Sequence, residues 1–161
     1  NQHADRLQMA NIAQTINVLQ AMILTQGEKM ILTPTYHVFE MYKVHQDATL
    51  LPADLQCEQY VSGEDKLPML NASASRDAAG RIHITLCNLD PEKSASLSCE
   101  LRGVQAKKIS GRVLTAPAIN SCNTFDAPEV VHPVALQGLQ LKGNLVSMTL
   151  PARSVVAVEI E

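Results

Sequence analysis

Carboxylates and imidazoles are the side chains that most often transfer protons in enzymes, and in this chain they are scattered. Glu40 lies beside Phe39 and Met41 in a predicted helix, which is typical of a carboxylate on a solvated helix face. His37 and His45 share a face of that helix but are eight residues apart, too far for a two-ligand metal site. The GxSxG, HExxH, P-loop and GxGxxG motifs are also missing. The sequence therefore predicts no catalytic residue, no metal site and no cofactor in this chain.

Four cysteines could carry thiol chemistry, but no two of them form a CxxC pair, so a zinc or redox motif is not predicted. Their number allows two disulfides. Reduced and mostly buried thiols are the favoured interpretation. The four are Cys57, Cys87, Cys99 and Cys122.

One uncharged polar group stands out, the amide of Gln14 among the apolar residues Ile12, Ala13 and Ile16. A buried amide needs a hydrogen-bond partner. One interpretation, favoured on these residues alone, is a structural glutamine that binds a neighbouring backbone group. The other applies if the segment is a strand of a (β/α)8 barrel, because the C-terminal ends of barrel strands face the active site. Gln14 could then bind a substrate hydroxyl or ring oxygen.

The segment that carries this glutamine, residues 9–24, is apolar and almost uncharged. Met9, Ile12 and Ile16 follow helical spacing, yet a strand covered on both faces also shows a continuous apolar run. The segment is too short, and too interrupted by amides, to span a bilayer. So short an apolar piece cannot bury itself, and we expect it to pack against protein outside this chain.

A helix follows a turn-like break at residues 26–29. Thr33 is the expected N-cap and Pro34 the first helical residue, the combination that helix starts favour. The apolar spacing continues to about His45 or Gln46, where the helix should end.

From about Thr49 onward the sequence changes to strand alternation with turn residues at short intervals. The segment 97–101 is the expected hairpin partner of 82–86, and the stretch 116–133 is expected to be an irregular crossover. Several short strands with regular turns predict a mainly β protein built as an antiparallel β-sandwich. The predicted strands lie at 82–86, 97–101, 112–114, 146–150 and 156–160.

Composition excludes several classes of function. The 161 residues carry a net charge of −3, and Lys107–Lys108 is the only basic pair in the C-terminal half, so neither nucleic acid nor membrane is an expected partner. Aromatic residues make up 3% and Trp is missing, which weakens the case for a carbohydrate-binding module. The first residues are polar and do not form a signal peptide.

Four segments of the chain resemble, in the same order along the sequence, the C-terminal part of the α-L-arabinofuranosidases of glycoside hydrolase family 51. The resemblance covers essentially the whole chain, and the first two segments are specific in combination. They read MANIAQTINVLQAMILT (9–25), TPTYHVFEMYKVHQDA (33–48), SASRDAAGRIHITLCNLDP (73–91) and SGRVLTAPAINSCNTFDAP (110–128).

The resemblance implies a (β/α)8 barrel followed by a jelly-roll β-sandwich. Residues 1–48 would hold the last barrel strand, at about 7–14, with its loop and helix, and residues 49–161 would hold the sandwich. Gln14 matches a family glutamine that hydrogen-bonds the arabinofuranosyl ring, whereas Asn11 and Asn17 would be structural. The enzyme's own N-terminus also contributes to the sandwich in this family.

The resemblance further implies retaining, exo-acting hydrolysis of arabinofuranosyl groups in arabinan, arabinoxylan or their oligosaccharides. A carboxylic acid protonates the departing oxygen and a second carboxylate forms a covalent glycosyl-enzyme. The family places both glutamates on barrel strands four and seven, and neither of their motifs occurs here. This chain would then be inactive alone, with the missing N-terminal barrel portion as its partner, in a cytoplasmic homo-oligomer.

Two alternatives stay open at this point. The chain could be a β-sandwich accessory module that binds carbohydrate or a partner protein, although such a module would not need the apolar segment 9–24. It could also belong to a related barrel glycosidase acting on another pentose or hexose, which Gln14 alone does not exclude.

Overall fold

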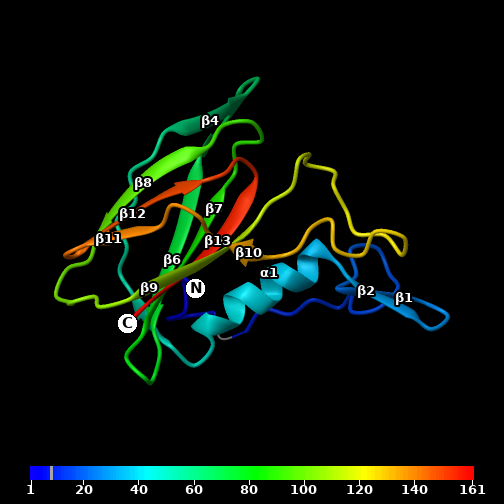
Figure 1. Cartoon of the computed structure of the whole chain (residues 1–161), viewed down its shortest axis with the longest axis horizontal. Coiled ribbons are helices and arrows are strands. Elements are labelled where there is room, and N and C mark those ends of the chain that lie inside the picture. Colours follow the sequence, from blue (N-terminus) through cyan, green and yellow to red (C-terminus); the bar gives the residue numbers. More distant parts are fainter. Residues whose placement is uncertain (8) are drawn as a thin grey trace.

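A computed structural model describes residues 1–7 and 9–161, which form one nine-residue α-helix, one 3₁₀ turn and a series of antiparallel strands (Figure 1). In chain order the elements are β1 (Ile23–Gln26), β2 (Lys29–Leu32), α1 (Pro34–Tyr42), η1 (Lys43–His45), β3 (Thr49–Leu51), β4 (Gln59–Ser62), β5 (Asp65–Pro68), β6 (Leu70–Arg76), β7 (Ile82–Asn88), β8 (Ala95–Glu100), β9 (Ile109–Leu114), β10 (Val134–Ala135), β11 (Gln140–Lys142), β12 (Leu145–Leu150) and β13 (Ser154–Ile160).

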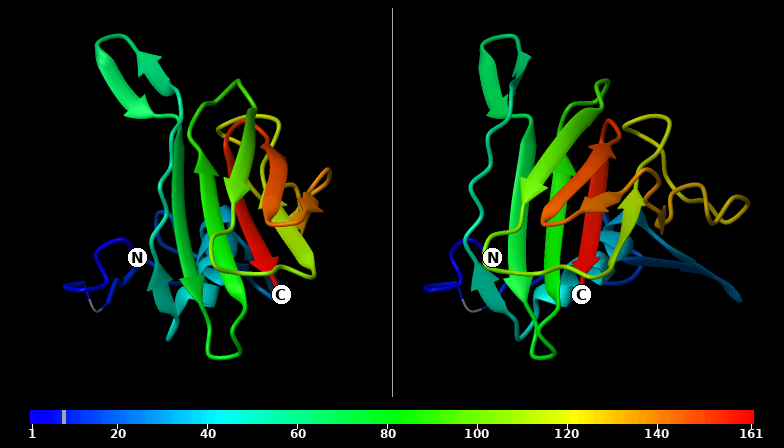
Figure 2. Two further views of the ribbon diagram at one scale, coloured as in Figure 1. Left: turned by 90° about the vertical axis from the view of Figure 1, so that its left-hand side faces the viewer. Right: turned by 60° about the vertical axis from the view of Figure 1, so that its left-hand side comes forward.

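Two sheets face each other and enclose the main core (Figure 2). The larger has the strand order β10-β9-β13-β7-β6-β3, and the smaller has the order β11-β12-β8. Alternate residues of β13, such as Val156 and Val158, point between the sheets and are fully buried, as are Val146 and Leu150 of β12. The predicted mainly β, antiparallel sandwich is therefore confirmed.

The other face of the six-stranded sheet is covered by α1. Met41 of the helix is completely buried and packs in one cluster with Leu114 of β9 and with Val155 and Ala157, the residues of β13 that alternate with its core positions. The predicted helix start is confirmed, because the Thr33 hydroxyl accepts a hydrogen bond from the Tyr36 amide at 3.5 Å.

Glu40 differs from its predicted solvated position. Its carboxylate lies 3.0 Å from Arg112 of β9 and 3.1 Å from Lys43, so it connects α1 to the sheet. Burial alone would raise the pKa of Glu40, but the hydrogen bonds from Lys43 and Arg112 outweigh it and the pKa is lowered.

The turn-like break at residues 26–29 is the turn of a β-hairpin. Gly27 adopts φ 59°, a left-handed conformation that suits glycine, and lets β1 pair with β2. A second hairpin, β4–β5, projects beyond the sheets (Figure 2). The stretch 116–133 forms the irregular crossover that was expected, with neither helix nor strand.

Two sequence expectations are not met. The segment 97–101 is not the hairpin partner of 82–86, because β8 pairs with β12 in the opposite sheet, with Leu97 opposite Met148. The strand expected over about residues 7–14 is not formed either: Leu7 and residues 9–14 are irregular, and Gln8 lies outside the described residues.

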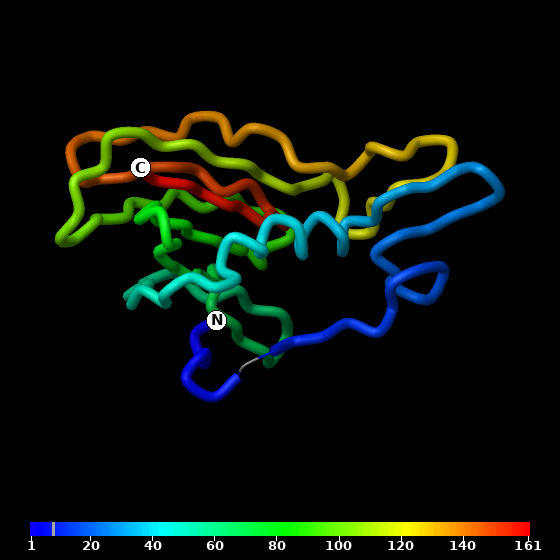
Figure 3. Tube along the Cα trace, turned by 90° about the horizontal axis from the view of Figure 1, so that it is seen from below, coloured from blue at the N-terminus to red at the C-terminus, as the bar shows by residue number. Residues whose placement is uncertain are grey.

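A strand requires a hydrogen-bonded neighbour, and no strand in the described ranges pairs with residues 9–14. Figure 3 follows this stretch from the N-terminus to the β1–β2 hairpin, outside both sheets. Its assignment to a barrel strand therefore stays a prediction for a longer protein.

The sandwich core predicts a contrast between two leucines that are three residues apart in the sequence. Leu86→Ala, at a side chain that is 1% exposed, should lower the free energy of unfolding by about 2–5 kcal/mol, because a cavity replaces buried methyl groups. Leu89→Ala, at a side chain that is 47% exposed, should cost about 0.5 kcal/mol or less. Urea unfolding followed by circular dichroism measures both; equal losses would contradict the assigned core.

Candidate functional site

Gln14 lies in an exposed loop rather than in a polar pocket. Its backbone oxygen accepts a hydrogen bond from the Met22 amide at 3.2 Å, while its side chain is exposed and makes no hydrogen bond within residues 1–7 and 9–161. The amide is therefore available to a ligand or to protein outside this chain. The ring-binding role of Gln14 remains a prediction.

The chain folds back on itself directly after Gln14. Residues 15–17 run beside Ile23, with amide-to-carbonyl distances of 3.0 Å from Ile23 to Thr15 and 3.1 Å from Asn17 to Ile23. The Asn17 side chain donates to the Thr25 hydroxyl at 2.8 Å and accepts from the Thr25 amide at 2.7 Å. Asn17 has φ 54°, a conformation that asparagine tolerates well, and its contacts fit the structural role expected for it.

The same loop is tied to the helix start. The Thr33 amide donates to Met22 O at 3.0 Å, and the Thr33 hydroxyl donates to Ala21 O at 2.7 Å. Ala21 is buried, so the loop is fixed where it meets the helix. Residues 14–33 thus form a single hydrogen-bonded unit at the N-terminus of α1.

Large apolar side chains of this unit and of the segment before it face solvent. Six of them are between 49% and 88% exposed, and large exposed apolar areas are uncommon on soluble proteins. This surface is typical of an interface with further protein. The six residues are Leu7, Met9, Ile16, Val18, Leu19 and Met30.

A second group of chemically capable residues lies between the helical region and the six-stranded sheet. His45 has Nδ1 at 2.7 Å from Ser75 Oγ and Nε2 at 2.8 Å from Thr85 Oγ1. The pair of His45 and Ser75 has the distance of a base and a nucleophile, but Ser75 and Thr85 are buried. The adjacent cavity of about 40 Å³ is far smaller than the roughly 300–1,000 Å³ of typical ligand pockets. We therefore assign these contacts a structural role.

Burial lowers the pKa of His45 to about 4, and the nearby His83 acts in the same direction. His83 itself lies 3.0 Å from Asp77, whose pKa is lowered by that hydrogen bond and by Arg81. In the described parts of the chain, no three His, Cys, Asp or Glu side chains form a group that could hold a metal ion.

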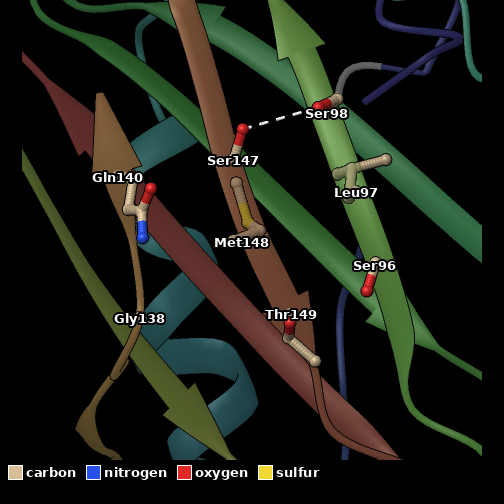
Figure 4. Close-up of a pocket in the computed structure, with 8 residues that line it drawn as sticks. All are labelled: Ser96, Leu97, Ser98, Gly138, Gln140, Ser147, Met148 and Thr149. Atoms are coloured by element: carbon tan, nitrogen blue, oxygen red, sulfur yellow. Dashed lines mark hydrogen bonds between the residues drawn. The ribbon is translucent and has the colours of Figure 1, made fainter. Parts of the chain in front are cut away.

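A hollow lies on the outer face of the three-stranded sheet (Figure 4), and Gln14 is not among its lining residues. It measures about 350 Å³ and presents hydroxyls and an amide but no acid or base; Ser98 and Ser147 lie 3.4 Å apart across it. Such a surface can form hydrogen bonds but cannot transfer protons to a substrate. The alternating Ser and Thr of two strands were its signal in the sequence, which the sequence reasoning did not use. Its lining is Ser96, Leu97, Ser98, Gly138, Gln140, Ser147, Met148 and Thr149.

The four cysteines carry free thiols, as favoured, but they are not mostly buried: Cys57 and Cys122 are exposed, and Cys87 and Cys99 are half-buried. Cys87 lies 3.3 Å from the Tyr42 hydroxyl under the helix, and burial raises the pKa of Tyr42. No helix in the described ranges is long and apolar enough to cross a membrane.

Solved arabinofuranosidase structures share this arrangement of sandwich, helix and loop. The family 51 arabinofuranosidase of Xanthomonas axonopodis pv. citri matches with a TM-score of 0.95 and 49% identity, over 99% of this chain and 32% of that one. The family 51 enzyme of Thermotoga petrophila matches with a TM-score of 0.85 and 26% identity, over 99% and 35%.

Sequence comparison gives the same result. An intracellular exo-α-L-arabinofuranosidase of Bacteroides ovatus is 44% identical over 100% of this chain and 32% of its own length. The family model described as the α-L-arabinofuranosidase C-terminal domain matches residues 1–154, and the chain belongs to this family. The chain spans about a third of the length of these relatives.

The buried imidazole predicts that stability depends on pH. Because the pKa of His45 falls from 6.5 to about 4 on folding, the unfolded chain takes up a proton first as the pH drops. The contribution of His45 to stability should be constant above about pH 6.5, decline between pH 6.5 and 4, and level off below.

His45→Gln should therefore flatten the pH dependence of the unfolding free energy in this range. The exposed His3 provides the control, since His3→Gln should leave the profile unchanged. Urea unfolding at intervals from pH 4 to 7 tests both, and a profile unaltered by His45→Gln would contradict a buried neutral imidazole.

Proposed function

We propose that this chain is the C-terminal portion of a retaining, exo-acting α-L-arabinofuranosidase. The enzyme would remove arabinofuranosyl groups from arabinan, arabinoxylan or their oligosaccharides. The observation that carries the proposal is that the entire chain matches one contiguous third of named arabinofuranosidases at up to 49% identity.

In this proposal residues 1–48 complete a (β/α)8 barrel and residues 49–161 form the C-terminal sandwich. The exposed apolar side chains around residues 7–30 support this division, because neighbouring barrel elements would cover them. The unpaired segment 9–14 would gain hydrogen-bonded strands on its sides, and its end would place Gln14 at the mouth of the barrel.

The chemistry would be performed by two carboxylates outside this chain. A retaining glycosidase needs an acid and a nucleophile about 5–5.5 Å apart on either side of the glycosidic bond. Among the described carboxylates, Glu40 and Asp77 are paired with cations, and Asp90 accepts hydrogen bonds from the backbone amides of Glu92 and Lys93. The contribution of this chain would be substrate binding by Gln14 and stabilisation of the barrel.

We also propose an intracellular enzyme that acts as a homo-oligomer. The location rests on the Bacteroides ovatus relative, which is named intracellular. The oligomer rests on the family resemblance.

The accessory-module alternative has one observation in its favour, the hydroxyl-lined hollow on the three-stranded sheet. It leaves the exposed apolar segment unexplained, because a free-standing module would have no reason to carry it. The arabinofuranosidase proposal accounts for both the sandwich and the segment.

The proposed role of Gln14 predicts a loss of transition-state binding. In the full-length enzyme, Gln14→Ala should lower kcat/KM for an aryl arabinofuranoside by the equivalent of roughly 1–3 kcal/mol, as expected for one lost hydrogen bond to the sugar. The matched control is Gln59→Ala, at an exposed glutamine of the projecting β4–β5 hairpin, which should leave kcat/KM unchanged. An unaltered kcat/KM in Gln14→Ala would return Gln14 to a structural role.

A further inference from the structure

Asn123 is a buried amide in the irregular crossover of the sandwich, and all of its polar atoms are used. It is 6% exposed. Its Nδ2 donates to Leu32 O at 2.8 Å and to Val131 O at 2.9 Å, and its Oδ1 accepts from the Val131 amide at 2.7 Å. Asn123 therefore joins the crossover to the last residue of β2, 91 positions earlier in the chain.

From Leu32 a short series of backbone hydrogen bonds leads to Gln14. Leu32 pairs with Ile23 across the β1–β2 hairpin. The next residue, Thr33, donates its amide to Met22 O at 3.0 Å, and the Met22 amide donates to Gln14 O at 3.2 Å. Each link is a backbone bond within a folded-back loop, so the position of Leu32 sets the position of the Gln14 backbone.

The bond from Asn123 to Leu32 has no equivalent nearby. Within the described residues it is the only hydrogen bond between residues 9–33 and residues 49–161. Figures 1 and 3 both show the 116–133 crossover beside the β1–β2 hairpin. Because a hydrogen bond is directional, this one resists displacement of the end of β2 relative to the crossover.

We propose that Asn123 is a positioning residue for Gln14: it fixes the end of β2 against the sandwich and so holds the glutamine amide at the sugar. This inference rests on the proposed function, because it needs Gln14 to contact substrate. The residue that positions the sugar contact would thus come from the β-sandwich and not from the barrel.

The test is a double-mutant cycle in the full-length enzyme, with an aryl arabinofuranoside as substrate. Asn123→Asp keeps the size and the acceptor of the side chain and removes both amide donors. It should lower kcat/KM about tenfold in the otherwise unchanged enzyme, and less than about twofold when Gln14→Ala is already present. Asn123→Ser removes the same amide without adding charge and replaces the Asp variant if that variant does not fold.

Asn88 supplies the matched control. It is also a buried amide, 2% exposed, and its Nδ2 lies within 3.4 Å of three carbonyl oxygens, those of Lys93, Leu150 and Pro151, none of them in the loop that carries Gln14. Asn88→Asp should lower the melting temperature while kcat/KM, measured well below that temperature, stays within about twofold.

The outcomes separate the two proposals. If the enzyme is active and Asn123→Asp causes the same fold-loss with and without Gln14→Ala, or no loss in a folded variant, the positioning role is overturned. If the unmodified enzyme does not cleave the arabinofuranoside, the proposed function itself fails. A loss that disappears in the Gln14→Ala background supports both.

Discussion

The structure depends on one constraint, which is that the six-stranded sheet must be covered on both faces. On β13 the residues Val156 and Val158 enter the sandwich core, while Val155 and Ala157 contact the helix. The three-stranded sheet covers one face and α1 the other, and Met41 of the helix is completely buried there. Helix and sandwich therefore form one packed body, although the helix belongs to residues 1–48, the part of the chain proposed to complete a barrel.

This packing decides where the exposed loop lies. Because α1 is fixed on the sheet, its capping residue Thr33 holds the loop that starts at Gln14, and Asn123 secures the same loop from the sandwich side. The buried polar contacts of His45 satisfy the hydroxyls beneath the helical region and do not form a second active site. Several of the most exposed apolar side chains, such as Met9 and Leu19, lie between residues 7 and 30, where the proposed barrel would meet them.

Local patterns predicted the local structure well. The alternation of residues 156–160 gave β13, and Thr33 followed by Pro34 gave the helix start, because both signals depend on neighbours in sequence. The predicted pairing of β8 with β7 was wrong, since strand pairing in a sandwich is decided by contacts across the fold. Leu7 and residues 9–14 form no strand, because no strand of the described chain pairs with them. Gln14 stood out as an amide among apolar residues, and its predicted role came from the family resemblance. Asn123 had no sequence signal, since its bond to Leu32 spans 91 positions.

The proposed division of labour, with catalysis in a barrel that residues 1–48 complete, is tested most directly by complementation. The N-terminal remainder of the enzyme and this chain would be produced separately and together, and release of arabinose from an aryl arabinofuranoside would be measured. We predict that neither piece is active alone and that activity returns when both are co-produced. Full activity of the N-terminal piece alone, or none from the co-purified pair, would contradict the proposal.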